Sequence, residues 1–389
     1  MSPVVGIDLI HFAISDFYLD LITLAKVRKQ DRRKFLTGIG QERMAVAPPD
    51  EDIITLAAKA AEPILAQGSR DQISAVIFAT ESGIDQSKSA GAFLHRLLEL
   101  PHRCRLFEIK HACYAGAAAL QTACNMVRVN PAEKVLVIAS DVARYDLETP
   151  GEATQGCGAI AMLITADPSV MVVEPGSGYH SDDVRDFWRP NYRATAIVDG
   201  KYSIKVYLDC LRNAWQHFRE ITGRNLDSID YFCYHAPFTK MASKAHHELL
   251  KLEESKSTED QINSRIGLSQ LYNRQIGNSF TASLFISLCS LLDHQSDLAG
   301  KRVGFFSFGS GCSCEFFSGL IQQHYESSLF KDSHEKQVRE RRAVSYEEYL
   351  DYYNKAVIDQ PDCEIPVYHA GPFRLTGTSG HHRQYVKTS

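Results

Sequence analysis

The sequence predicts an α/β protein built from two similar halves, and three observations support this prediction. Short apolar runs bounded by turn-forming or charged residues are typical of buried strands. Amphipathic helical patterns alternate with these runs along the chain, which is typical of α/β proteins. One helix-then-strand order occurs twice, which indicates a duplicated unit. The predicted buried strands, expected to run parallel, cover residues 73–80, 134–140, 159–165 and 302–308.

The first element is expected to be a strand. The opening segment, residues 1–16, has no basic region, and Asp8 interrupts its short apolar stretch, so it does not match a signal peptide. The helical patterns that follow cover residues 53–66, 90–98, 114–129, 204–222 and 281–294.

The duplication is indicated by two residues, Cys113 and Asn278, each followed by a helix and a strand. The strand predicted from residue 134 begins 21 residues after Cys113 (134 − 113), and the strand predicted from residue 302 begins 24 residues after Asn278 (302 − 278). Residues 167–200 are rich in turn formers and are expected to connect the halves. Beyond residue 323 the chain becomes polar, and the charged run at 331–342 is typical of a solvated helix face. The predicted domains are therefore residues 1–166, 167–324 and an appended region, 325–389.

Composition excludes several classes of function. The 389 residues are 44% hydrophobic and 23% charged, as in ordinary globular proteins, which excludes a disordered, collagen-like or coiled-coil chain. The net charge of −5 provides no overall basic field for nucleic acid. The apolar runs are far shorter than the roughly 20 residues that span a bilayer. A cytoplasmic protein without nucleic-acid or membrane partners is predicted.

The ten cysteines are scattered and form no CxxC pair. In a cytoplasmic protein most of them, such as Cys124, are expected to be reduced, buried and inert. Cys312 and Cys314 form a CxC pair, but no second pair stands nearby, so no metal site is predicted.

Cys113 is the first candidate for chemistry. It follows a short predicted strand and precedes an alanine-rich helix. A thiol at a helix N-terminus faces the positive end of the helix dipole, which favours the thiolate. The alternative is a buried packing cysteine.

Glu81 and His235 each follow an apolar run directly, so each is expected at the carboxyl end of a strand. Functional groups of α/β proteins gather at this edge of the sheet. A partly buried carboxylate can serve as a general acid or base, and a histidine beside a cysteine can serve thiol or thioester chemistry. The alternatives are a solvated turn glutamate and a structural histidine.

Two further candidates could stabilise charge on a carbonyl. The amide of Asn278 can polarise a carbonyl group. The Gly309–Ser310–Gly311 turn can offer backbone N–H groups to an oxyanion. Both features are common in structural roles as well.

Taken together, these residues resemble the 3-hydroxy-3-methylglutaryl (HMG) synthase family of the thiolase superfamily. The similarity extends to about residue 322. It includes the motifs ATESGID, FEIKHACYAG, YHAPFTKM, IGNSFTASL and FSFGSGCSCEFFSG. The resemblance implies a thiolase-like five-layered αβαβα fold of two pseudo-symmetric halves, and a homodimer.

The resemblance also implies roles for the candidates. Cys113 would hold an acetyl group, Glu81 would remove a methyl proton from it, and His235 would act at the carbonyl of a 3-oxoacyl thioester. Water would then release the product, and no cofactor or metal beyond the thioesters would be needed. Ser310 would supply an oxyanion N–H together with that of Cys113. The family positions that line the acyl pocket correspond to Tyr145, Thr154 and Asn278.

Two branches of the family are compatible with the sequence. One introduces β-branches into polyketides and takes its donor and acceptor from acyl carrier proteins. The other makes HMG-CoA from CoA thioesters in the mevalonate pathway. ESGIDQSKS, CRLFEIKHACYAG and GHHRQYVK resemble the polyketide branch, which we favour, whereas DFWRP and FTKMASK resemble the mevalonate branch.

Contacts with the carrier or CoA are expected at basic residues. Lys240 and Lys244 stand where CoA-using members hold phosphates. A basic cluster at residues 28–34 could meet an acidic carrier protein or a phosphate, or could be a solvated helix face. A non-catalytic scaffold is a remote alternative, against which the joint presence of Glu81, Cys113 and His235 argues.

Overall fold

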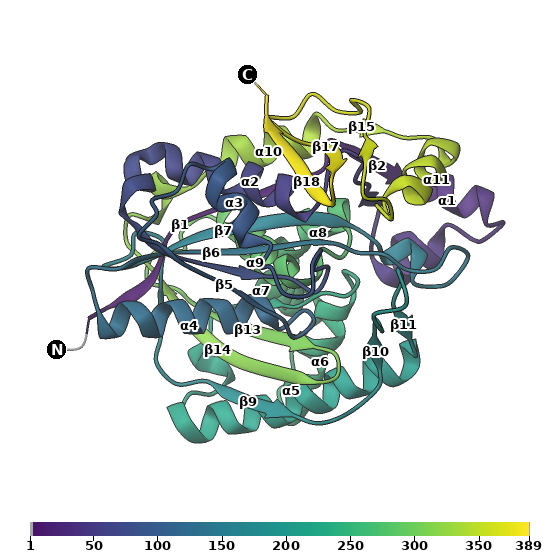
Figure 1. Cartoon of the computed structure of the whole chain (residues 1–389). Helices are drawn as coiled ribbons and strands as arrows, with labels where there is room; N and C mark the ends of the chain where they lie inside the picture. Colours follow the sequence, from purple (N-terminus) through teal and green to yellow (C-terminus); the bar gives the residue numbers. More distant parts are fainter. Residues whose placement is uncertain (1–2, 389) are drawn as a thin grey trace.

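The computed structural model describes residues 3–388, and its centre is a mixed sheet of ten strands (Figure 1). The strand predicted at the start of the chain is present as β1. The other four predicted strands are present as β4, β6, β7 and β13. In order across the sheet the strands are β12 (Tyr231–Tyr234), β13 (Arg302–Gly309), β14 (Ser313–Ile321), β8 (Met171–Val173), β1 (Val5–Ile14), β7 (Cys157–Ala166), β6 (Lys134–Val142), β4 (Ile73–Ala79) and β5 (Arg105–Ile109), while β9 (Gly178–Ser181) also pairs with β14.

Strand direction corrects one expectation. β4 runs parallel to β5 and β6, and β12 runs parallel to β13. β7, however, is antiparallel to both of its neighbours, β1 and β6. All but the last of its residues are buried. Burial on both faces makes a strand continuously apolar whatever its direction, so the apolar run did not reveal the direction.

The segment predicted as a connection, residues 167–200, is also more structured than expected. Its strand β8 pairs with β1 on one side and with β14 on the other, so it joins the strands of the two halves into one sheet. The same segment contains β9 and a short hairpin of β10 (Phe187–Trp188) and β11 (Ile197–Val198).

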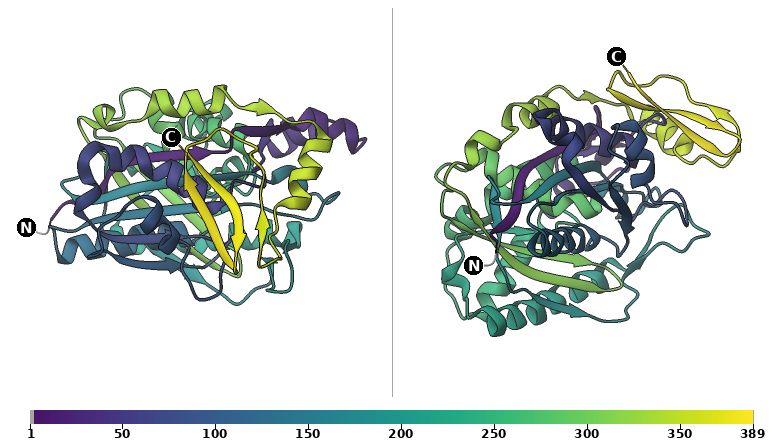
Figure 2. Two further views of the ribbon diagram at one scale, coloured as in Figure 1. Left: turned by 45° about the horizontal axis from the view of Figure 1, so that its top comes forward. Right: turned by 60° about the vertical axis from the view of Figure 1, so that its left-hand side comes forward.

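Helices cover the strands in the layered order of a thiolase-like α/β fold. α2 packs on β1, β6 and β7, whereas α5 packs on β9 and β14 beside α6. α4 and α9 lie between the two groups of strands, where α4 contacts β6 and β7 and α9 contacts β12 and β13 (Figures 1 and 2). The five helices of these layers are α2 (Ile53–Ile64), α4 (Ala115–Val129), α5 (Gly200–Thr222), α6 (Met241–Leu252) and α9 (Ser283–His294).

Local signals explain where these helices begin and end. Asp52 and Thr55 form a capping box at the start of α2, and the side chain of Asp199 caps α5. Gly223 adopts a positive φ of 69° at the end of α5, a conformation in which glycine carries no steric penalty. The predicted helix at residues 204–222 therefore begins four residues earlier, directly after its cap.

The two central helices show the duplication more clearly than the sequence does. α4 begins 19 residues before β6 (134 − 115), and α9 begins 19 residues before β13 (302 − 283). Ala112 and Phe280 both have positive φ, 42° and 46°, and each lies three residues before its helix. The counterpart of Cys113 is therefore Thr281 and not Asn278, because a short 3-10 turn separates Asn278 from α9.

The ends of these two helices meet in the centre of the molecule. A Cβ atom on Gly116 would lie 2.6 Å from the carbonyl oxygen of Thr281, so only glycine allows this approach. The meeting of the two N-termini brings residues from both halves to one place.

The remaining elements surround this core. The predicted helix at residues 90–98 is present as α3. The C-terminal strands lie against α3, at the top of Figure 1. The charged run at 331–342 forms α10 and β15, of which His334 and Arg341 are buried. These elements are β2 (Phe17–Asp20), α1 (Leu21–Val27), β3 (Arg43–Ala45), α3 (Gly91–Leu97), α7 (Glu259–Ile266), α8 (Leu271–Ile276), α10 (Lys331–Arg339), β15 (Arg342–Ala343), α11 (Tyr346–Lys355), β16 (Cys363–Glu364), β17 (Phe373–Ser379) and β18 (His382–Lys387).

Within residues 3–388, no helix has the length and apolar character needed to cross a bilayer. The histidine, cysteine and acidic side chains of the same residues form no group of three or more that could hold a metal ion. The division of the chain at residues 166 and 324 stays a prediction.

Candidate active site

Glu81 and Cys113 come together at the carboxyl ends of the neighbouring strands β4 and β5. Glu81 follows β4, and Cys113 lies in the turn between β5 and α4. The Cys113 thiol donates a hydrogen bond to Glu81 Oε2 with an Sγ···O distance of 3.0 Å. Ala112, directly before Cys113, has a positive φ of 42°, an uncommon conformation for a residue other than glycine. The structure therefore places a thiol and a carboxyl group in direct contact.

Asp141, at the carboxyl end of β6, holds this pair in position and was not predicted. Its side chain is fully buried. One oxygen accepts hydrogen bonds from the Thr80 hydroxyl and from the backbone N–H groups of Glu81 and Ser82 at 2.8–3.0 Å. The other accepts from the N–H group and the hydroxyl of Thr281, in the opposite half. A polar residue ending an apolar strand was the signal that could have revealed it.

The electrostatics of the pair correct one expectation. Burial, with the nearby charge of Asp141, raises the pKa of Glu81 to about 8. Burial and the neighbouring Glu81 also raise the pKa of the Cys113 thiol well above its usual value. The helix dipole therefore does not make Cys113 a thiolate, and the thiol needs a base. Glu81, which accepts its hydrogen bond, is placed to be that base.

His235 follows β12 directly, as predicted, and its side chain is 1% exposed. Its N–H donates to the Phe306 carbonyl at 2.8 Å, and its own carbonyl accepts from the Tyr207 hydroxyl at 2.8 Å. Its Nδ1 lies 2.7 Å from the Ser283 hydroxyl. Burial lowers the pKa of the imidazole to about 3, so the ring is neutral at physiological pH.

An aromatic wall stands beside Cys113. The rings of Tyr145, Phe187 and Phe280 meet edge to face with centroid distances of 5.9–6.2 Å. Cys113 packs against this cluster. Its aromatic composition suits a small apolar acyl group. Phe187 and Phe280 were not among the predicted site residues.

Three predicted acyl-pocket residues meet at this wall. Asn278 and Thr154 both lie beside the Tyr145 hydroxyl, where their side chains lower its pKa, although burial raises that pKa overall. The backbone N–H of Asn278 donates to the Thr154 carbonyl at 3.0 Å. The structure thus joins residues of both halves around the hydroxyl of Tyr145.

The turn containing Ser310 lies against the Cys113 turn. A Cβ on Gly309 would lie 2.6 Å from the His111 carbonyl oxygen and 2.7 Å from the Tyr114 nitrogen, so the two turns touch closely. The N–H of Gly311 donates to the buried carboxylate of Asp186 at 3.0 Å. Asp186, from DFWRP, fixes this turn.

The predicted basic contacts lie apart from these groups on an exposed surface. Lys240 and Lys244 are exposed around the start of α6, and Lys240 donates to the Thr37 carbonyl at 3.3 Å. This contact joins the start of α6 to the stretch that directly follows the basic segment 28–34. Arg28 is not available to a ligand, because it forms ion pairs with Glu152 and Glu148. The other basic residues of the segment are exposed, namely Lys29, Arg32, Arg33 and Lys34.

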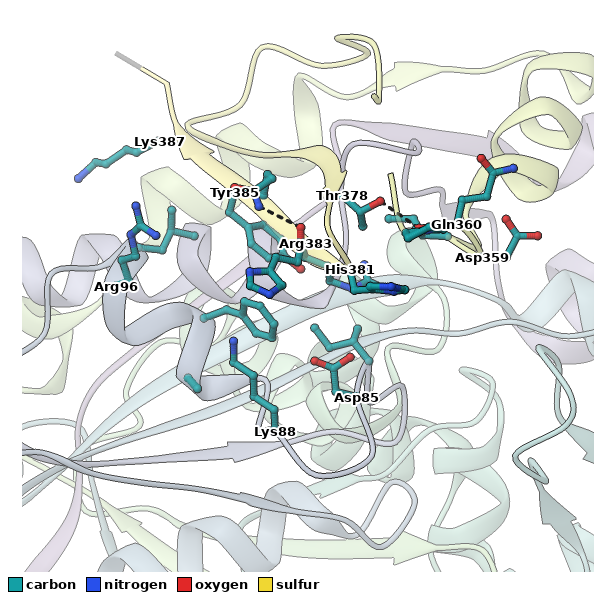
Figure 3. Close-up of a pocket in the computed structure, with 18 of the residues that line it drawn as sticks. Asp85, Lys88, Arg96, Asp359, Gln360, Thr378, His381, Arg383, Tyr385 and Lys387 are labelled. Atoms are coloured by element: carbon teal, nitrogen blue, oxygen red, sulfur yellow. Dashed lines mark hydrogen bonds between the residues drawn. The ribbon is translucent and has the colours of Figure 1, made fainter. Parts of the chain in front are cut away.

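A separate cleft of about 880 Å³ lies between α3 and the C-terminal strands (Figure 3). None of the predicted site residues lines it. Its basic side chains are largely engaged, since Lys387 pairs with Glu62, Arg383 with Asp52, and Lys88 lies over the Phe93 ring.

The fold and this site together define a condensing, acyl-transferring enzyme of the thiolase-like class. The family profile "Hydroxymethylglutaryl-coenzyme A synthase N terminal" matches residues 2–169, and "Hydroxymethylglutaryl-coenzyme A synthase C terminal" matches residues 171–262 and 247–360. The chain belongs to the hydroxymethylglutaryl-CoA synthase family.

Curated relatives come from both branches. The chain is 40% identical to the hydroxymethylglutaryl-CoA synthase of Enterococcus faecalis, over 89% of this chain and 90% of that protein. It is 35% identical to the polyketide biosynthesis 3-hydroxy-3-methylglutaryl-ACP synthase PksG of Bacillus subtilis, over 88% and 86%.

Solved structures similar to this chain also come from both branches. An HMG-CoA synthase complexed with CoA superposes with a TM-score of 0.93 at 36% identity, covering 99% of this chain and 100% of that chain. The curacin biosynthetic pathway HMG synthase in complex with holo donor-ACP superposes with a TM-score of 0.94 at 31% identity, with the same coverage. The comparisons therefore support the family without separating its two branches.

Proposed function

We propose that Cys113 captures an acetyl group from a thioester donor with Glu81 as its base. The observation that supports this step is the 3.0 Å hydrogen bond from the Cys113 thiol to Glu81 Oε2. As the sulfur attacks the acetyl carbonyl, the thiol proton passes to Glu81 and then to the leaving thiol of the donor. The new bond is the Cys113 thioester, and the broken bond is that of the donor.

Glu81 then removes a proton from the methyl group of acetyl-Cys113. A thioester makes this proton acidic, and a carboxyl group with a pKa near the working pH can both take and return it. The carbanion equivalent adds to the ketone carbon of a 3-oxoacyl thioester and forms the new carbon–carbon bond. The resulting alkoxide receives the proton from Glu81, so the proton count closes.

His235 would bind the ketone oxygen of the acceptor. A neutral imidazole donates one hydrogen bond to a carbonyl and so favours negative charge on its oxygen. Water finally cleaves the Cys113 thioester, which yields a free carboxylate and restores the thiol. These steps use only side chains of this chain and the two thioesters, so we propose no cofactor. A thiol nucleophile suits a reducing compartment such as the cytoplasm.

We further propose that acyl carrier proteins deliver both substrates, as in polyketide β-branching. The supporting observation is that the exposed Lys240 contacts Thr37, in the stretch that directly follows the exposed basic residues of segment 28–34. A surface of this kind attracts an acidic protein partner over a wide area.

The second candidate is HMG-CoA synthesis from acetyl-CoA and acetoacetyl-CoA. The same lysines can bind CoA phosphates, and the 40% identity to the Enterococcus enzyme favours this alternative. Intact-protein mass spectrometry after brief incubation with acetyl-CoA or with an acetyl-loaded carrier protein separates the two. Acetylation from the carrier alone supports the first proposal, and efficient acetylation from CoA favours the second. No adduct from either donor contradicts capture by Cys113.

A homodimer is also proposed. β5 is at one end of the sheet and pairs only with β4 among the described strands. An unpaired edge can accept the same strand of a second copy and so continue the sheet. Light scattering on the purified protein is expected to give twice the mass of 43.5 kDa. A monomer at micromolar concentration would contradict this assembly.

A further inference from the structure

Ser283 is the group that faces the imidazole of His235 from α9. The serine is the first residue of that helix and is fully buried. Its Oγ lies 2.7 Å from His235 Nδ1, and this is the only hydrogen bond that the serine hydroxyl makes within the described residues. Nε2 of His235 has no hydrogen-bonding partner among those residues, so it is left for a substrate.

The direction of this hydrogen bond follows from satisfying both groups. If Nδ1 carried the proton, it would donate to Oγ, and the buried serine hydroxyl would have no acceptor for its own hydrogen. If Nδ1 is unprotonated, the hydroxyl donates to it and both groups are satisfied. Buried polar groups strongly favour the arrangement without an orphan.

We propose that Ser283 is a positioning residue that holds His235 in the tautomer with the hydrogen on Nε2. This inference rests on the proposed function, in which the ring binds the acceptor ketone. With the hydrogen on Nε2, the neutral ring is a hydrogen-bond donor to the ketone oxygen. In the other tautomer it would present a lone pair and repel that oxygen.

The main chain that carries the His235 ring is itself held by hydrogen bonds. Its N–H and carbonyl are both held, by Phe306 and Tyr207. Ser283 is held in turn, because its carbonyl accepts hydrogen bonds from Asn273 at 3.2 Å and from the Ser287 hydroxyl at 3.2 Å. The hydroxyl and the imidazole are thus fixed on two different elements of the same half.

The test separates capture from condensation. In Ser283→Ala, acetylation of Cys113 should match the wild type, whereas the condensation rate with a 3-oxoacyl thioester should fall about tenfold, since part of the usual acid–base contribution is lost. Ser290→Ala is the matched control, because Ser290 is equally buried on the same helix and its hydroxyl bonds to Leu268 and Tyr272, away from His235 and Ser283. It should retain the condensation rate.

The outcomes distinguish this inference from the proposed function. If the wild type does not acetylate Cys113, the proposed function fails. If the wild type condenses and Ser283→Ala condenses equally fast, the role of Ser283 is refuted. Ser283→Thr, which keeps the hydroxyl, should recover most of the condensation rate, and failure of this rescue in a folded variant would also count against it.

A second measurement needs no Ser283 variant. In wild-type protein with 15N-labelled histidine, the His235 signals, assigned by their loss in His235→Gln, should show a protonated Nε2 and an unprotonated Nδ1. A protonated Nδ1 would overturn the inference even if the alanine variant did not fold. A purely structural serine would not determine the tautomer.

Discussion

The two halves of the molecule present matching positions with different chemistry. Cys113 and Thr281 occupy equivalent turns, each two residues before a central helix and directly after a residue with positive φ. Cys113 is partly exposed and points at Glu81, whereas Thr281 is buried and donates to Asp141. The Cys113 turn therefore presents a partly exposed thiol, whereas the Thr281 turn binds the buried carboxylate of Asp141, which also accepts from the N–H of Glu81.

The same contrast holds at the first residue of each helix. α4 begins with Ala115, which has no polar side chain, and α9 begins with Ser283, which contacts His235. The residues after the parallel strands differ as well, because β4 leads to a carboxyl with a raised pKa and β12 to an imidazole with a lowered pKa. Duplication provides two equivalent frames, and their side chains differ, with a thiol and a carboxyl group in one half and a serine hydroxyl and an imidazole in the other.

The largest expected effect comes from replacing Cys113 or Thr281 by alanine in two separate variants. Cys113→Ala should reduce acetyl capture at least about a thousandfold, since the nucleophile is lost. Thr281→Ala should retain capture but lower the free energy of unfolding by about 2 kcal/mol, because a hydrogen bond to a buried carboxylate is lost. Mass spectrometry and denaturant unfolding measure the two effects. Equal loss of capture in both variants would remove the distinction.

The raised pKa of Glu81 predicts two opposite pH effects. Capture requires the ionised carboxyl, so its rate should rise with pH and level off above about 8. Stability should move the other way, because a carboxyl whose folded pKa exceeds its unfolded value stabilises the fold below the unfolded pKa. That contribution is lost as pH rises through the folded pKa.

Glu81→Gln should remove both dependences. Its free energy of unfolding should exceed that of the wild type by about 4 kcal/mol more at pH ~9 than at pH ~5, because the wild-type carboxyl titrates near 8 in the folded state. Urea unfolding at the two pH values is the measurement. If the variant and the wild type differ in stability by the same amount at both pH values, the pKa of Glu81 is not raised in the folded state.

Asp141→Asn tests the role of Asp141, which links the two halves through its hydrogen bonds to Thr281. Removing the nearby negative charge should lower the pKa of Glu81, so the midpoint of the pH–rate profile for capture should move down by about one unit. The variant should also lose about 2 kcal/mol of stability, since an amide nitrogen cannot accept the Thr281 hydrogen bonds. A stability loss with an unmoved midpoint would limit Asp141 to a structural role.

An effect on stability alone tests the contact between the two central helices. Gly116→Ala places a methyl group against the Thr281 carbonyl and should cost about 2 kcal/mol, although alanine is the better helix former. Thr122→Ala, in the same helix and partly exposed, is the control for helix propensity. Stabilisation of both variants would show that the helix ends do not meet as closely as described.

Several parts of the site were predictable because they follow from local rules. Glu81 and His235 end apolar runs, and Cys113 precedes an alanine-rich helix, so each was assigned correctly to its position on an element. Phe187 and Phe280 were not foreseen, because aromatic residues in a two-residue hairpin strand and at a turn carry no local sign that they will meet. The basic segment was only partly as expected, since the ion pairs of Arg28 join residues more than a hundred positions apart.

The amino-acid sequence by itself determined the alternation of strands and helices, the family motifs and the candidate residues Glu81, Cys113 and His235. These depend on residue type and short-range spacing, which the chain displays directly. Only the tertiary structure decided the antiparallel direction of β7 and the joining of the halves through β8. It also decided that Thr281 occupies the position equivalent to Cys113, and that the pKa of the Cys113 thiol is raised so that the thiol stays protonated. Direction, register and pKa arise from contacts and burial between distant segments, and no local pattern encodes them.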